Sequence, residues 1–139
     1  MSKTPKGKAK SRLNAIKHGL RATDDLFLES LAPQERAIHN QIRHSLHEEY
    51  KPLSEREIHL VDRMAIHHLR LYRIYSLENR ATAESQRAPL SRGSVIHHLD
   101  RLSRYDWRIE RQLRMLHNRL YALYTSRGDH SLKLISRND

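Results

Sequence analysis

The sequence contains no cysteine, which excludes a disulfide framework, a thiolate zinc site and a cysteine nucleophile. Glycine and proline occur only four times each, and there is one Phe and one Trp. No stretch has the roughly 18 consecutive apolar residues that a membrane-spanning helix needs. A chain with so few glycines, prolines and bulky aromatic residues is typical of long amphipathic helices. We therefore expect an all-α cytoplasmic protein of one domain.

Acidic residues are missing from the first twenty-one positions, which hold five lysines and two arginines. This segment carries +7 of the chain's formal net charge of +10. Unpaired ammonium groups cannot be buried, so the segment stays solvated or lies against an external polyanion. Nucleic acid is the partner that we expect, because binding to phosphates releases condensed counterions. A nuclear-localisation run or a patch for anionic lipid is a weaker alternative.

The pattern of helix signals predicts four parts of the chain. A basic arm is followed by a short helix that begins near Ser11 and stops at Gly19. A short apolar segment begins at Asp24 or Asp25, and Pro33 opens a helix to about Glu49. The four parts are a basic arm with a short helix at 1–21, short helices at 22–53, a long helical hairpin at 54–128 and a tail at 129–139.

Two long helices are expected to form the hairpin. A capping box, Ser54-x-x-Glu57, opens the first, which continues to about Arg87. Pro89, Ser91 and Gly93 mark the turn between them. Apolar residues share one broad face of the first helix: Ile58, Val61, Met64, Ala65, Leu69, Leu71, Tyr72 and Tyr75. The second has a coiled-coil-like heptad pattern: Val95, Leu102, Ile109, Leu116 and Leu123, with Leu99, Leu113 and Leu120.

Helices joined by a short turn run antiparallel and bury their apolar stripes together. We therefore predict a long antiparallel helical hairpin with short N-terminal helices and a basic flexible arm. The interface within one hairpin is too small to bury so many Leu and Tyr side chains. Self-association, or membership of a larger complex, is also expected.

An arginine stripe follows the last helix at intervals of three and four residues: Arg101, Arg104, Arg108 and Arg111. Their planar guanidinium groups suit phosphate, because each donates two parallel hydrogen bonds. Trp107 flanks the stripe and either stacks on a base or anchors the N-terminal helices as a second core layer. A merely solvated polar face is the alternative for the whole stripe.

A second set of arginines lies on the preceding helix: Arg56, Arg63, Arg70 and Arg73. We expect these to serve surface solubility, with partial pairing inside the helix.

Eleven histidines are present, including His67-His68, His97-His98 and His44-x-x-His47. Metal binding is possible in principle, but adjacent histidines point to different sides of a helix, and the hairpin separates the two pairs. We expect His68 and His98 on or beside the apolar stripes and the others at the surface. No metal or other cofactor is predicted.

Signatures of catalysis are absent from the sequence. It has no glycine-rich phosphate loop, no G-x-S-x-G and no H-E-x-x-H. Acidic residues are scattered among basic ones rather than paired. We expect a protein that is not an enzyme.

The N-terminal residues resemble those of a known group of proteins. Thr4-Pro5-Lys6-Gly7-Lys8 and the box Asn14-Ala15-Ile16-Lys17-His18-Gly19-Leu20 resemble the start of a family of small uncharacterised bacterial and phage proteins. The resemblance extends more weakly to Leu69–Arg73 with Leu77-Glu78, and to Leu102–Tyr105 with Arg108 and Arg111. Two positions depart from the pattern of that family. Lys6 stands where the family usually has an acidic residue, and His68 stands near the position where a tryptophan often precedes the Arg-Leu pair. Similar boxes occur in small-terminase-like and mobile-element-associated proteins, so the resemblance implies DNA binding.

The leading hypothesis is therefore a non-catalytic nucleic-acid-binding protein of phage or mobile-element type, with DNA favoured over RNA by the resemblance alone. The alternative is a helical adaptor that binds an acidic protein or a ribonucleoprotein within a larger assembly. The expected nucleic-acid contacts are Lys3, Lys6, Lys8, Lys10, Arg12, Asn14, Lys17, His18, Arg21, Arg104, Trp107, Arg108 and Arg111.

Overall fold

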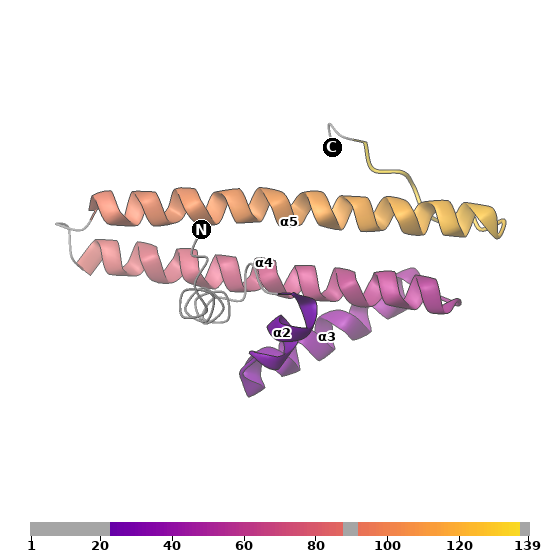
Figure 1. Ribbon diagram of the computed structural model, residues 1–139, viewed down its shortest axis with the longest axis horizontal. Helices are drawn as coiled ribbons and strands as arrows, with labels where there is room; N and C mark the ends of the chain where they lie inside the picture. The colour runs from indigo at the N-terminus through magenta and orange to yellow at the C-terminus, as the bar shows by residue number, and fades with distance from the viewer. Residues whose placement is uncertain (1–22, 88–91, 137–139) are drawn as a thin grey trace, which may run out of the picture.

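The computed structural model describes residues 23–87 and 92–136, with no side-chain detail for 84, 85, 87 and 92–98. These residues form four helices and no strand (Figure 1): α2 Asp24–Glu29, α3 Pro33–Tyr50, α4 Glu55–Arg87 and α5 Arg92–Ser126. The all-α prediction is confirmed. The short helix predicted from Ser11 to Gly19 lies outside the described residues, as do Pro89 and Ser91.

The long hairpin is formed by α4 and α5, which lie side by side along their length (Figure 1). The predicted capping box begins α4: the Glu57 N–H donates to Ser54 Oγ at 3.2 Å, and the Ser54 N–H donates to the Glu57 carboxylate at 3.3 Å. Helix α5 begins at Arg92, so Gly93 lies inside the helix rather than in the turn that we predicted. The heptad leucines Leu102 and Leu116 are buried against α4.

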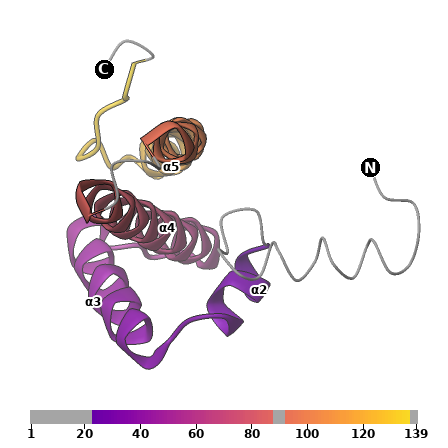
Figure 2. The same ribbon diagram turned by 90° about the vertical axis from the view of Figure 1, so that its left-hand side faces the viewer.

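The second face of α4 is covered by α2 and α3, which lie on the side away from α5 (Figure 2). Phe27 and Leu31 pack there with Ile66 and Leu69. The predicted single broad face of α4 was therefore wrong in part: Ile66 is buried, whereas Tyr72 and Tyr75 are about half exposed. Helix α4 is the middle layer of three, because an amphipathic helix with two apolar sides needs two partners.

Glu57 caps α4 and also forms an ion pair at the end of the hairpin where α4 begins and α5 ends. Its carboxylate is buried and lies 3.2 Å from Nη1 of Arg127, just beyond the end of α5. The Tyr124 hydroxyl donates to the backbone carbonyl of Tyr50 at the end of α3. These contacts fix the ends of α3, α4 and α5 relative to one another.

The segment after α5 returns along that helix. Asn118 donates to the carbonyl oxygen of Ile135 and accepts from its N–H, each at 3.0 Å. His117 Nε2 lies 2.7 Å from the carbonyl of Lys133, and its Nδ1 lies 2.8 Å from the Tyr50 hydroxyl. Because a carbonyl oxygen can only accept, Nε2 donates to it, and in the neutral imidazole Nδ1 then accepts from the Tyr50 hydroxyl. Burial raises the pKa of Tyr50 to about 12, which keeps that donor protonated.

His67 is buried, contrary to the expectation that it titrates at the surface. Its side chain is 9% exposed, and neither ring nitrogen has a hydrogen-bond partner. Burial, and then the nearby Arg70 charge, lower its pKa to about 4, while Asp24 acts in the opposite direction. The fold therefore holds this imidazole in its neutral form.

Stability should depend on the protonation of His67 between pH 6.5 and pH 4. The unfolded chain binds the proton near pH 6.5 and the folded chain only near pH 4, so stability falls as the pH drops through this window. We expect His67→Leu to flatten that dependence by about 2 kcal/mol, as measured by urea unfolding at several pH values. His44→Leu, at an exposed position of α3, is the matched control. An unchanged pH dependence in His67→Leu would contradict this account.

Candidate functional site

The N-terminal candidates lie outside the described residues. They are Lys3, Lys6, Lys8, Lys10, Arg12, Asn14, Lys17, His18 and Arg21. Their expected contact with nucleic acid remains a prediction. The other four candidates, Arg104, Trp107, Arg108 and Arg111, are all exposed on α5.

Two arginines of α4 hold the short helices in place. Our prediction that they serve surface solubility is therefore wrong. The Arg70 side chain is 6% exposed and donates to Asp24 of α2 at 3.0 Å. The Arg73 side chain is 13% exposed and binds both carboxylate oxygens of Glu35 of α3, at 3.0 and 3.1 Å. Their guanidinium carbons lie 4.5 and 4.7 Å from the centroid of the Phe27 ring. Both arginines are thus internal to the fold.

Further basic residues on this side of the molecule are also neutralised by acids. Arg43 and His47 of α3 both reach Asp62 of α4, at 2.8 and 2.7 Å. Burial would raise the pKa of Asp62, but the hydrogen bonds from His47 and Arg43 hold it below its usual value. Arg63 lies 3.6 Å from Asp24, which therefore faces two arginines. Asp24, Glu35 and Asp62 are thus each paired with an arginine of a neighbouring helix.

The outer face of α5 has a different charge balance. Arg101, Arg104, Arg108 and Arg111 are exposed on the side of α5 away from the buried Leu102 and Leu116. Arg104 has an ion pair only with Asp100 of the same helix, at 2.9 Å, and both side chains are more than half exposed. Such an exposed pair contributes little to stability. Within the described residues, neither Arg101 nor Arg108 has an acidic partner.

The two other acids of α5 lie away from the arginine stripe. Asp106 and Glu110 face Tyr75 of α4: burial first, and then these carboxylates, raise the pKa of Tyr75. Burial and the neighbouring Asp106 likewise raise the pKa of Glu110. Helical spacing places both acids on the flank of α5 rather than on its outer face. The stripe consequently keeps its positive charge.

Trp107 lies in the stripe and is 64% exposed. The alternative in which it anchors the N-terminal helices as a second core layer is wrong for α2 and α3, which lie on the other side of α4 (Figure 2). The Arg111 guanidinium lies 5.8 Å from the Trp107 ring centroid. The indole ring is available to a partner from outside.

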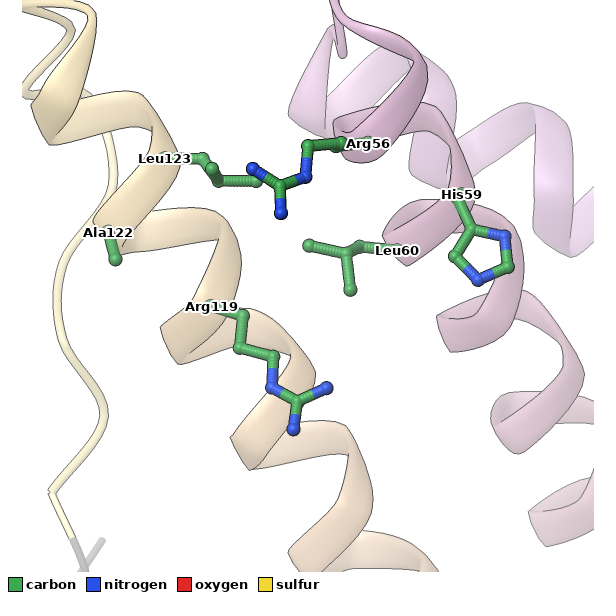
Figure 3. A pocket seen from close by; sticks show the side chains of 6 residues that line it. All are labelled: Arg56, His59, Leu60, Arg119, Ala122 and Leu123. Atoms are coloured by element: carbon green, nitrogen blue, oxygen red, sulfur yellow. The ribbon is translucent and has the colours of Figure 1, made fainter.

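A groove between the start of α4 and the end of α5 was missed by the sequence analysis. Its volume is about 430 Å³, and Arg56 and Arg119 extend toward the space around Leu60 (Figure 3). His59, Ala122 and Leu123 complete its lining. Neither guanidinium forms an ion pair with any acid among the described residues. The pairing of these positions depends on the antiparallel register, which sequence spacing alone does not give.

Histidines do not gather into a metal site in the described part of the chain, where no three His, Cys, Asp or Glu side chains are placed to hold an ion. His44 is exposed and His47 is bound to Asp62. His68 is half-buried beside the groove between α3 and α4, while the side chains of His97 and His98 lie outside the described set.

No family model, curated protein or solved structure matches this chain. None of the helices described here is both long and apolar enough to cross a membrane. The arginine stripe and the groove of Arg56 and Arg119 are the main exposed cationic features of the described residues.

Two variants that each remove one arginine charge should distinguish an arginine held inside the fold from an arginine exposed to solvent. Arg73→Gln removes the contacts to Glu35 and Phe27, so we expect it to lower the free energy of unfolding by about 2 kcal/mol. Arg108→Gln removes an exposed charge and should change stability by less than about 0.5 kcal/mol. Urea unfolding measures both. Equal destabilisation of the two variants would show that Arg108 is also held by the fold.

Proposed function

We propose that the protein binds nucleic acid without catalysing a reaction and contacts the phosphate backbone with its basic N-terminal arm and the α5 arginine stripe. The observation that carries this proposal is the segregation of the arginines. Those facing α2 and α3 are paired with acids of other helices, whereas those on the outer face of α5 are exposed and only Arg104 has an ion pair, with Asp100 of the same helix. A formal charge of +10 attracts polyanions over longer distances.

Phosphate is the anion that best fits this surface. Arg101 and Arg119 lie eighteen residues apart, which corresponds to roughly 27 Å along a helix. A long row of exposed cations suits a polymer with regularly repeated charge better than a single small anion. The preference for DNA, and the phage or mobile-element setting, are proposed on the resemblance of the N-terminal box.

An adaptor that binds an acidic protein is the second candidate. Its support is an apolar groove between α3 and α4, where Tyr72 and Tyr75 are about half exposed beside Ile42 and Leu71. Exposed apolar surface of this kind is typical of contacts between proteins. An acidic protein, unlike a nucleic acid, does not carry its negative charges at a regular spacing. It would therefore match the row of arginines on α5 less well.

The salt dependence of binding tests the nucleic-acid proposal. Binding of a 20-base-pair DNA duplex should weaken steeply with salt, and log K should fall linearly with log[salt]. Replacing Arg101, Arg104, Arg108 and Arg111 by Gln should reduce that slope by about 0.9 for each phosphate that the protein no longer neutralises. Replacing Lys3, Lys6, Lys8 and Lys10 by Gln should have a similar effect.

Arg80→Gln is the control, because this arginine is exposed on α4. We expect it to leave the slope of the salt dependence unchanged. No measurable binding at low salt, or a slope that neither set of replacements reduces, would overturn the proposed function.

A further inference from the structure

One ridge of α5 alternates apolar and cationic side chains. Every fourth residue from Trp107 lies along a single row, which turns about the helix axis by roughly 40° at each step. The row reads Trp107, Arg111, Met115, Arg119 and Leu123. Its last two members line the groove shown in Figure 3, so the ridge leads directly into that groove.

The apolar members of this ridge are unusually exposed. Trp107 is 64% and Met115 is 41% exposed, and both arginines between and beyond them are exposed as well. The returning C-terminal segment is bound through His117 and Asn118, which are not members of the ridge. Trp107 and Met115 remain exposed beside this segment. A contiguous apolar and cationic surface of this kind indicates contact with a partner.

The alternation along the ridge matches the chemistry of one nucleic-acid strand. A flat or apolar side chain can stack against a base, and the neighbouring guanidinium can bind the phosphate that follows. The groove at the end of the ridge has an apolar lining of Leu60, Ala122 and Leu123 between two arginines. That lining suits an unstacked base, because bases also stack on guanidinium planes.

A duplex cannot use these features fully. Its base faces are covered by neighbouring base pairs, so it would offer phosphates to the arginines but nothing for Trp107, Met115 or the floor of the groove. A single strand offers both groups in alternation. The apolar side chains of the ridge therefore favour single-stranded over duplex nucleic acid.

We propose that the ridge from Trp107 to Leu123 is a track for single-stranded nucleic acid, with base stacking on Trp107 and a second base in the groove of Arg56 and Arg119. This inference rests on the proposed function and narrows its substrate class. It assigns the arginines to phosphates, and Trp107 and Met115 to bases.

The fluorescence of Trp107 tests the track directly, because the chain contains no other tryptophan. The full-length protein is titrated with oligo(dT) of 20 nucleotides and with a 20-base-pair duplex at the same salt concentration. We expect oligo(dT) to quench Trp107 and to bind at least about fivefold more tightly than the duplex. The duplex should cause little quenching.

Substitutions on the ridge separate stacking from charge. Trp107→Ala should weaken oligo(dT) binding by about tenfold, while the salt slope and duplex affinity stay unchanged, and Trp107→Phe should restore most of the affinity. Affinities of the tryptophan variants are measured with fluorescently labelled oligonucleotides. Arg119→Gln should reduce the salt slope for the single strand by about 0.7. Arg80→Gln, which removes the same charge from α4, should change neither measurement.

Each contrary result has a distinct meaning. Failure to bind either nucleic acid at low salt would overturn the proposed function together with this inference. Duplex binding that equals or exceeds binding of oligo(dT), without quenching of Trp107, would overturn the track but leave the proposed function intact. A change in Trp107 emission with protein concentration alone would assign the ridge to self-association and also overturn the track.

Discussion

The arrangement of this protein depends on two arginines one turn apart on α4. Arg70 and Arg73 lie against the Phe27 ring, and their guanidinium groups bind Asp24 and Glu35. Through these contacts one helix holds both short helices on the same side. A buried charge is costly unless it is paired and hydrogen-bonded, so the position of α2 and α3 is closely tied to these pairs.

The same pairing determines where positive charge remains. Acids of α2 and α3 neutralise arginines that face inward, and Glu57 at the start of α4 binds Arg127 at the end of the hairpin. No comparable set of acids faces outward from α5 among the residues described. The layer order, with α4 between α5 and the short helices (Figure 2), consequently places these ion pairs and the exposed arginines of α5 in different parts of the molecule.

Sequence patterns predicted the elements of this fold better than its contacts. Pro33 and the Ser54–Glu57 box gave the starts of α3 and α4, because capping is a local interaction. The heptad of α5 likewise predicted its buried face. In contrast, Arg70 and Arg108 look alike in sequence, and only the distant Asp24 makes Arg70 an internal residue. The burial of His67 and the exposure of Tyr72 depend in the same way on which helices cover α4.

The central claim is that the inward arginines belong to the fold and the outward arginines to an external phosphate polymer. NMR spectra of the arginine Nε–Hε groups, recorded during titration with an oligonucleotide, test it most directly. The account predicts that the Arg104, Arg108 and Arg111 signals shift together while those of Arg70 and Arg73 stay in place. Shifts confined to Arg70 and Arg73, or an unchanged set of α5 signals in a protein saturated with nucleic acid, would contradict it.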